Sequence, residues 1–432
     1  MKIAIVGSGI SGLVAAHHLH AAHDITVFEA GAYVGGHTNT VDVTAPGPSG
    51  EPAPRTVPID TGFIVFNEKT YPNFIALLTE LGVAWQASDM SFSVKCEGTG
   101  LEYNGTSFDA LFAQRTNFLR PRFWRMVRDI LRFYREAPSI LEQAENGATL
   151  GEFLDAGGYS AMFVDKHIVP MTSAIWSAET DGVLDFPLRF LVQFFQNHGF
   201  LQVDDRPQWL TVTGGSREYV RAITRPWADR IRLETPVVGL ERRSGRVVLR
   251  TRDGSQEAFD RVVLACHSDT ALAILGDGAT ATEREVVGAF GYQRNTALLH
   301  TDASLMPRRK KAWAAWNYHV TEPASELSTV TYWMNELQSL PTSRDHFVTL
   351  NRDADVDPAT VERSIVYHHP IFTTRAVAMQ ARHDEVDGVG GVHFAGAYWR
   401  YGFHEDGVRS GLRVAERILA PSNAVVARGA AL

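Results

Sequence analysis

The sequence predicts an α/β fold: a Rossmann-type nucleotide-binding domain, discontinuous in the chain, with an α+β domain inserted into it. Three observations predict this arrangement. A short β-branched run at residues 2–6 leads at once into a glycine-rich turn, a helical stretch and a second apolar run at 25–29. Similar buried-strand runs return at 261–265 and at 392–395. The segments between these runs have helical or antiparallel-sheet patterns instead. We therefore expect strands that are far apart in the sequence to form one domain.

The first βαβ unit consists of a strand at 2–6, a helix at 11–22 and a strand at 25–29. The Pro/Gly-rich segment 44–56 is typical of a surface loop and resembles the tip of a hairpin. Helical patterns extend from 108 to about 198, and two β-rich runs flank a turn at Ser244-Gly245. Residues 289–350 alternate aromatic and polar positions, which predicts an antiparallel sheet, and a last helix follows Gly407 and extends to about 419.

These elements divide the chain into two domains. We assign residues 1–88, 205–288 and 386–420 to the nucleotide-binding domain. Residues 89–204 and 289–385 form the inserted substrate domain.

Composition excludes several classes of protein. The 432 residues are 45% hydrophobic and 21% charged, which is typical of a globular protein, and the net charge of −8 argues against a nucleic-acid binder. The two cysteines, Cys96 and Cys266, cannot form a disulfide framework and fit a reducing compartment. No apolar run is long enough to span a membrane. We expect a cytoplasmic protein, and contact with the inner face of the membrane stays open.

The turn after the first strand is a dinucleotide fingerprint, Gly7-Ser8-Gly9-Ile10-Ser11-Gly12. The first glycine allows the tight turn, Gly9 lets the backbone approach a pyrophosphate, and Gly12 permits close packing of helix and strand. The helix start then presents free N–H groups to the phosphates. Glu29 ends the second strand, where its carboxylate can accept hydrogen bonds from a ribose. An acidic residue there disfavours NADP.

Two further features favour FAD over NAD. Gly35-Gly36 follows Glu29 by six residues and allows backbone to pass close to a second phosphate region. Near the other end of the chain, Phe394-Ala395-Gly396-Ala397 leads through Gly402 into a second helix start. The dipole of that helix would stabilise an anionic reduced flavin.

Longer motifs carry a resemblance to a known family. They are Gly35-Gly36-His37, DTGFIVFN from Asp60, TYPN from Thr70, TYWMN from Thr331, His369-Pro370 and YGFHEDG from Tyr401. The chain resembles the flavin-containing amine oxidoreductase superfamily, which includes monoamine oxidases, carotenoid desaturases and protoporphyrinogen oxidase. It is most similar to the branch fused to plant cyclopropane fatty acid synthases and to free-standing bacterial flavoproteins of lipid-modifying operons. The resemblance covers almost the whole chain and implies an amine-oxidase-like fold.

The resemblance also implies cofactor contacts. Residues on the ADP half would be Gly7, Gly9, Ser11, Gly12, Glu29, Ala30, Gly35, Gly36 and His37, with Val238 pairing with adenine through its backbone and Ala265 lining the nucleotide. Thr61, Gly62 and Phe63 would lie by the isoalloxazine, and Gly396, Asp406, Gly407 and Val408 by the ribityl and pyrimidine edge. His37 departs from the family pattern, because many members have arginine there. The aromatic cage and flavin-bridging lysine typical of amine oxidases are not evident, which puts amine oxidation in doubt.

In this branch the implied substrate is an unsaturated or methyl-branched acyl chain, free or in a phospholipid. Hydride removal from an allylic carbon to flavin, followed by proton loss, would give desaturation; hydride return at another carbon would give isomerisation. Tyr401 and His404 are the candidate catalytic residues. The alternatives are an amine or small-molecule oxidase of the same fold, and a non-catalytic flavoprotein that presents lipid. A methyltransferase of the cyclopropane synthase type is a candidate partner.

Three other features remain to be weighed. The aromatics Phe194, Trp316, Tyr332 and Trp333 are candidates for an apolar substrate tunnel, although aromatics at this density also form core. Arginines alternate with aromatics between Arg115 and Arg135, which suits either an anionic membrane interface or a solvated basic helix face. His17, His18, His20 and His23 are best explained as the solvent-facing side of the first helix, so we expect no metal site.

Overall fold

The nucleotide-binding half is built on a five-stranded parallel sheet in the order β10-β2-β1-β14-β20. A computed structural model describes residues 1–48, 53–144, 147–204 and 206–420. The strands are β1 (Lys2–Val6), β2 (Asp24–Phe28), β10 (Ile231–Arg232), β14 (Arg261–Leu264) and β20 (Val392–Phe394). Ile3, Ile5 and Val263 are fully buried, as expected for strands covered on both faces. The sheet therefore draws on widely separated segments, as the sequence predicts.

Helices cover this sheet, and two of them cross in direct contact. α1 (Ile10–Leu19) follows β1, and α15 (His404–Leu419) follows β20. The other helices of this half are α2 (Pro72–Leu81), α9 (Arg217–Thr224), α10 (Ser268–Leu275) and α11 (Ala281–Val287). The helices α13 (Thr374–Gln380) and α14 (His383–Val386) pack against α11, although α13 and most of α14 belong to the segment 289–385 that the sequence assigns to the substrate domain. A separate antiparallel sheet contains β11 (Val237–Arg243), β12 (Arg246–Thr251) and β13 (Gln256–Phe259), and the turn at Ser244-Gly245 joins its first two strands.

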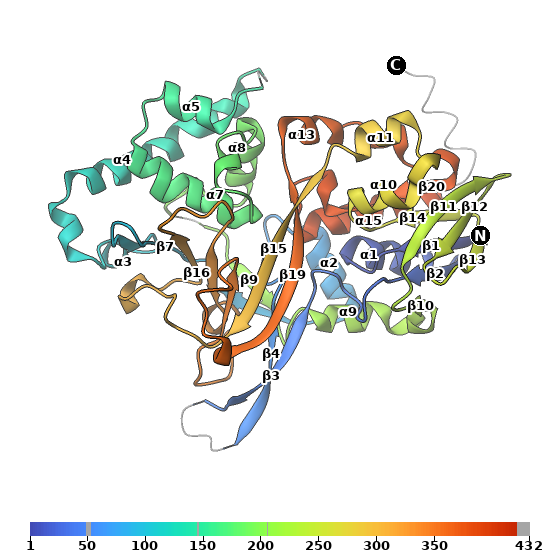
Figure 1. Cartoon of the computed structure of the whole chain (residues 1–432), viewed down its shortest axis with the longest axis horizontal. Helices are drawn as coiled ribbons and strands as arrows, with labels where there is room; N and C mark the ends of the chain where they lie inside the picture. Colours follow the sequence, from blue (N-terminus) through green and yellow to red (C-terminus); the bar gives the residue numbers. More distant parts are fainter. Residues whose placement is uncertain (49–52, 145–146, 205, 421–432) are drawn as a thin grey trace.

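A seven-stranded sheet in the order β19-β15-β18-β17-β16-β7-β8 forms the framework of the other half. It contains β7 (Phe92–Cys96), β8 (Glu102–Asn104), β15 (Gly291–His300), β16 (Trp316–Val320), β17 (Val330–Trp333), β18 (Phe347–Leu350) and β19 (Val361–Ile371). All neighbours pair antiparallel except β16 and β7, which run parallel. The long strands β15 and β19 run between the two halves of the molecule (Figure 1).

Helices gather at the end of the molecule that lies opposite the N-terminus (Figure 1). They are α3 (Phe108–Leu111), α4 (Pro121–Glu136), α5 (Leu150–Ala156), α6 (Ala161–Phe163), α7 (Val169–Trp176) and α8 (Leu188–Asn197), with a short helix, α12 (Met334–Gln338), after β17. Two small antiparallel units complete the fold: the hairpin β3 (Thr40–Pro46) with β4 (Pro54–Asp60), and β9 (Trp209–Val212) between β5 (Phe66–Asn67) and β6 (Trp85–Ser88).

Two local predictions differ from the structure in their bounds. The segment 44–56 was expected to be a loop at a hairpin tip; β3 and β4 form that hairpin, but Thr44 and Thr56 pair within the ladder, so the strands extend into the segment from both sides, and its tip lies outside the described residues. The last helix was expected to begin after Gly407, yet α15 begins at His404. Phe403 N–H donates to Asp406 Oδ2 at 3.0 Å, and this cap starts the helix upstream of the glycine. In the part of the chain that the structure describes, no helix is long and apolar enough to cross a bilayer.

Candidate functional site

The turn between β1 and α1 has the geometry that a pyrophosphate site requires. Gly7 adopts φ +105°, and a Cβ there would stand 2.7 Å from the Ala265 carbonyl oxygen. A Cβ on Gly12 would stand 2.0 Å from the Gly7 oxygen, so helix and turn touch backbone to backbone. By contrast, nothing lies within 4 Å of a Cβ placed on Gly9. The space therefore lies over Gly9, at the N-terminus of α1, where an anion is favoured.

Glu29 stands beside this turn at the end of β2. Its carboxylate accepts hydrogen bonds from Ser8 N–H at 3.0 Å, from Ser8 Oγ at 2.5 Å and from Gly31 N–H at 2.8 Å. Ala30, between Glu29 and Gly31, is exposed. A partly exposed carboxylate held in this way is an acceptor placed for ribose hydroxyls. The residues present at the turn thus fit the ADP half of a dinucleotide.

The paired glycines close over the same space. Gly35 and Gly36 have φ of +131° and +60°, a conformation that side chains rarely adopt. A Cβ on Gly36 would stand 3.2 Å from the Gly9 Cα, so the two glycine turns approach each other closely. Gly35 N–H also donates to Ser8 Oγ at 3.3 Å. The two turns thus bring backbone close together beside the N-terminus of α1.

His37, where many relatives have arginine, carries no positive charge at neutral pH. Its ring stacks on Tyr367 at 4.9 Å and lies 5.4 Å from the ring of His369 and 6.0 Å from that of His267. Burial, together with the neighbouring histidines, holds the pKa of His37 well below 6.5. This side chain is therefore an aromatic wall rather than a phosphate-binding cation.

The loop Thr61-Gly62-Phe63 is held against His37. Phe63 N–H donates to the His37 carbonyl oxygen at 2.8 Å, and a Cβ on Gly62 would stand 2.2 Å from that same oxygen. Thr61 Oγ1 donates to the Asn39 carbonyl at 2.9 Å and lies 2.8 Å from Tyr367 Oη. These bonds fix the loop that is predicted to lie beside the isoalloxazine.

His404 joins this loop to the second helix start. Its ring stacks on Phe63 with centroids 3.6 Å apart and planes 6° apart. Nε2 lies 2.7 Å from Tyr219 Oη, and burial lowers the pKa of His404 to about 3. The imidazole is thus neutral and already engaged, an arrangement that suits the positioning of Phe63. A catalytic role for His404 stays a prediction.

The other predicted residues of the C-terminal segment lie along α15. Asp406 caps the helix, stands 3.4 Å from Arg400 Nε, and has its pKa raised to about 7 by burial. Gly407 faces α1, and Val408 is buried in the core beside it. Gly396 N–H donates to Ser410 Oγ at 2.9 Å, and a Cβ on Gly396 would collide with the Tyr398 ring. The residues that the sequence assigns to cofactor contact in this segment therefore also hold α15 in place.

Val238 occupies a β-bulge between β11 and β12. Val237 pairs with Thr251 and Gly239 with Arg250, which leaves Val238 without a ladder partner. Its backbone groups are therefore available for the adenine pairing that the resemblance implies.

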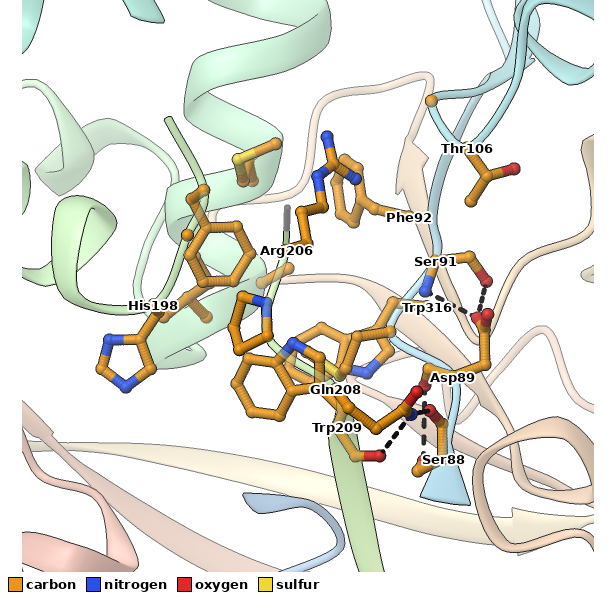
Figure 2. Close-up of a pocket in the computed structure, with 18 of the residues that line it drawn as sticks. Ser88, Asp89, Ser91, Phe92, Thr106, His198, Arg206, Gln208, Trp209 and Trp316 are labelled. Atoms are coloured by element: carbon orange, nitrogen blue, oxygen red, sulfur yellow. Dashed lines mark hydrogen bonds between the residues drawn. The ribbon is translucent and has the colours of Figure 1, made fainter. Parts of the chain in front are cut away.

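A cavity of about 320 Å³ lies in the substrate half, between α7, α8, β7 and the loop before β9. Figure 2 shows Phe92, Trp209 and Trp316 around it, together with Arg206. Its apolar lining residues are Met90, Phe92, Tyr103, Tyr134, Met171, Ala174, Ile175, Phe200, Pro207, Trp209 and Trp316. The cavity is thus bounded mainly by hydrocarbon and aromatic surface.

Of the four candidate tunnel residues, only Trp316 lines this cavity. Phe194 lies one layer behind, with its ring 3.9 Å from that of the lining residue His198. Tyr332 packs under Trp316 at 4.8 Å. Trp333 bonds to Asp345 Oδ1 through Nε1 and packs on Trp313. Tyr332 and Trp333 are consecutive residues of β17 and point to opposite faces of the sheet, so they do not share one wall.

Tyr401 lies in the C-terminal segment, against the aromatic layer that backs the cavity wall. Its ring is 4.7 Å from Phe190 and 5.6 Å from Phe194, and its carbonyl accepts Trp176 Nε1 at 3.0 Å. Burial raises the pKa of Tyr401. Its phenol group remains the candidate for proton transfer.

Sequence reasoning missed several polar residues of the site. Asp89, His198 and Arg206 line the cavity but lie in loops or at a helix end, without a periodic pattern or motif. Asp60 was passed over although it begins the DTGF motif. Its carboxylate accepts hydrogen bonds from Thr40, Ser216 and Gln338. Only its place in that motif could have singled it out.

A search of curated protein sequences returned no match. The solved structure of cyclohexylamine oxidase from Brevibacterium oxydans is 19% identical, with a TM-score of 0.69 over 96% of this chain and 98% of that one. A fatty acid isomerase from P. acnes, described as producing CLA, gives 15% identity and a TM-score of 0.67 over 97% and 98%. Putrescine oxidase bound to putrescine gives 17% identity and a TM-score of 0.65 over 98% and 100%. These likenesses establish the fold.

The model of the family described as flavin containing amine oxidoreductase matches residues 10–294 and 311–419. Those residues include Ser11 and Gly12 at the start of α1, the 61–63 loop and all of α15. The open space over Gly9 and the carboxylate of Glu29 fit the cofactor that the family requires. The chain therefore belongs to the flavin containing amine oxidoreductase family, and its cofactor is FAD.

Proposed function

We propose that this flavoprotein oxidises an unsaturated or methyl-branched fatty acyl chain, free or in a phospholipid, and gives a desaturated product. The observation that carries the proposal is the apolar cavity and its place beside the C-terminal segment. Bound flavin would supply a two-electron acceptor for hydride from an allylic carbon. The chain's own residues would align the hydrocarbon and exclude water.

One aromatic layer separates the cavity from the segment at the start of α15. The ring of His198, a lining residue, lies 6.0 Å from that of Phe403. Phe194 fills the gap, 3.9 Å from His198 and 4.9 Å from Phe403. A shift of these rings would join the cavity to the flavin side. Aromatic and methionine walls suit a chain that offers no hydrogen bonds.

The cavity also holds polar groups without partners. Arg206 Nε donates to the Gln202 carbonyl at 2.9 Å, and within the described residues its terminal nitrogens have no partner. Nε2 of His167 and Nε1 of Trp316 are buried without a hydrogen bond in the same part of the chain. Buried polar atoms without a partner are costly unless a ligand or water satisfies them. A carboxylate or phosphate head would accept hydrogen bonds from the exposed guanidinium of Arg206.

Double-bond isomerisation is a close variant of this proposal, because the same alignment serves hydride return to another carbon of the chain. The fatty acid isomerase from P. acnes, which shares the fold, supports an acyl chain as substrate in either variant.

Oxidation of a small amine is the second candidate, and Asp89 favours it. This carboxylate lines the cavity and accepts a hydrogen bond from Ser91 N–H at 2.7 Å, as well as one from Ser91 Oγ. An ammonium group could pair with it. Two of the solved structures with this fold are amine oxidases by name.

Anaerobic mixing separates these functions. The FAD-loaded protein is mixed with free fatty acids or phospholipids that carry unsaturated or methyl-branched chains, and in a parallel arm with primary amines. We expect flavin absorbance to bleach with acyl chains and the product to lose two hydrogen atoms by mass spectrometry. A moved double bond at unchanged mass would support the isomerase. Bleaching by amines alone, or no bleaching and no altered chain, would overturn the proposal; the second result would favour a flavoprotein that only presents lipid.

A further inference from the structure

We propose that a basic tip of the molecule, residues 108–135, docks on an anionic lipid bilayer. The tip contains α3, the single helical turn Arg115–Leu119 and most of α4. It lies at the outer edge of the helical half, away from the N-terminus (Figure 1). The inference concerns a surface outside the cavity and does not depend on the proposed reaction.

The tip exposes large apolar side chains at unusual density. Leu119 is 86% exposed, and Phe108 is 62% exposed. The other large hydrophobic residues exposed there are Phe118, Trp124 and Leu131. Side chains of this size in one short stretch of surface mark an interaction site rather than ordinary scatter.

These side chains are held on a fixed platform. Phe118 stacks on the buried Phe112 with centroids 3.9 Å apart and planes 11° apart. The Trp124 ring lies 5.0 Å from that of Phe112, and Trp124 Nε1 donates to the Phe118 carbonyl at 3.0 Å. The contacts of Phe118 and Trp124 therefore hold their rings in a preformed apolar face, so these side chains need not be ordered on binding.

The positive charge of the tip favours an anionic partner. The tip contains seven arginines and two aspartates, a net of plus five, whereas the whole chain carries −8. Arg115 pairs with Asp109, and Arg125 lies 4.0 Å from Asp129. Arg122, Arg128 and Arg135 are exposed and have no ion-pair partner among the described residues. Arginines around exposed Trp, Phe and Leu suit the anionic headgroups and the acyl boundary of a bilayer.

A hollow beside the tip adds a place for a headgroup. It measures about 900 Å³ and is lined by Arg120, Arg122, Arg125 and Lys166, with Leu119 at its rim. Arg120 Nη1 donates a hydrogen bond to Asn117 Oδ1 at 3.2 Å. Among the described residues, no Asp or Glu side chain lines this hollow. A lipid phosphate would be drawn to these cations while Leu119 inserts beside it.

Vesicle binding tests the proposal with the full-length FAD-loaded protein. We expect co-sedimentation with vesicles of phosphatidylcholine and phosphatidylglycerol, none with phosphatidylcholine alone, and release at high salt. The double substitution Arg122→Gln with Arg128→Gln should weaken the apparent Kd about thirtyfold, since each basic residue near a membrane surface strengthens binding about fivefold. Arg225→Gln with Arg252→Gln, an equal change of charge at exposed residues of the other half, should have no effect.

A second pair of variants tests the apolar contact. Leu119→Glu should abolish binding, while Leu233→Glu, at a residue 40% exposed on the other half, should not. Unchanged thermal midpoints establish that each variant is folded. Binding to neutral vesicles as strong as to anionic ones, binding to neither, or equal effects of tip and control variants would each overturn the proposal. So would a dimer that Leu119→Glu disrupts, because a second copy would then cover the tip.

Discussion

Gly407 of α15 lies against Ile10 of α1 so closely that a Cβ on the glycine would stand 2.4 Å from Ile10 Cγ2. One turn later, a Cβ on Gly411 would stand 2.6 Å from the Ser11 carbonyl oxygen. The two glycines let the helices cross in contact. Helix starts that come from opposite ends of the chain are thereby fixed relative to each other, and both frame the cofactor site.

Gly407→Ala should separate these helices. The added methyl group has no space, so we expect a loss of about 1–3 kcal/mol of stability, typical of overpacking, and weaker retention of FAD. Thermal denaturation and flavin content after gel filtration measure the two effects. Gly182→Ala is the matched control, because nothing lies within 4 Å of a Cβ at that exposed position. Equal behaviour of the two variants would refute this account of the crossing.

Glu29→Gln should weaken FAD binding without unfolding the protein. The amide has one acceptor oxygen, so it keeps the bonds from Ser8 or the bond from Gly31 but not both, and it loses the charge that favours ribose hydroxyls. A hydrogen bond to a charged group contributes about 1.5–3 kcal/mol, so the Kd for FAD should rise by roughly ten- to a hundredfold, measured by quenching of flavin fluorescence. Glu241→Gln, at an exposed glutamate paired with Arg243, is the control. An unchanged Kd for FAD would show that Glu29 serves only the turn.

Local patterns predicted most of the nucleotide half. The fingerprint at Gly7–Gly12, the strand at 261–265 and the hairpin turn at Ser244 depend on residues close in sequence, and the structure has each of them where the sequence places it. The start of α15 was misplaced because a glycine such as Gly407 is typical of a helix boundary. A glycine is required there instead because Gly407 contacts Ile10, which is nearly four hundred residues away in the sequence.

The cavity could not be predicted for the same reason. Its lining joins Asp89, His167 and Arg206, which belong to a loop, a helix and another loop. No spacing links them, because tertiary packing alone brings them together. The parallel pairing of β16 with β7 is likewise invisible to a local alternation pattern.

Buried histidines should make the protein sensitive to acid. Burial lowers the pKa of His167 and His404 to about 3. It lowers the pKa of His198, His300, His369 and His383 to about 4. Between pH 6.5 and about 4 the unfolded chain therefore binds protons that the folded chain does not, and the free energy of unfolding falls as the pH falls. For one histidine whose pKa falls from 6.5 in the unfolded chain to about 4 in the folded chain, the free energy of unfolding drops by about 3 kcal/mol over this pH range.

Thermal midpoints recorded from pH 7.5 to pH 4 check this expectation. The midpoint should drop steeply below pH 6, and more than half of the drop should be reversible if the pH is restored before aggregation. His300→Asn, which removes one buried imidazole beside Thr349, should flatten the slope. His20→Gln, on the partly exposed side of α1, should leave it unchanged. A midpoint that is constant over this range would contradict the assignment of neutral histidines.

Arg206 and Asp89 should discriminate between the two candidate substrates. If the substrate has an anionic head, Arg206→Gln removes a charge-assisted contact worth about 1.5–3 kcal/mol, so KM should rise roughly ten- to a hundredfold with little change in kcat. Asp89→Asn should then lower KM modestly, because a like charge leaves the cavity.

For an amine substrate the directions are reversed, since Asp89 would hold the ammonium group and Arg206 would repel it. Steady-state kinetics of both variants, with Arg252→Gln as the surface control, decide between them. Identical KM values for wild type and Arg206→Gln with every acyl substrate would place the head group elsewhere, and would leave the partnerless nitrogens of His167 and Trp316 to bound water.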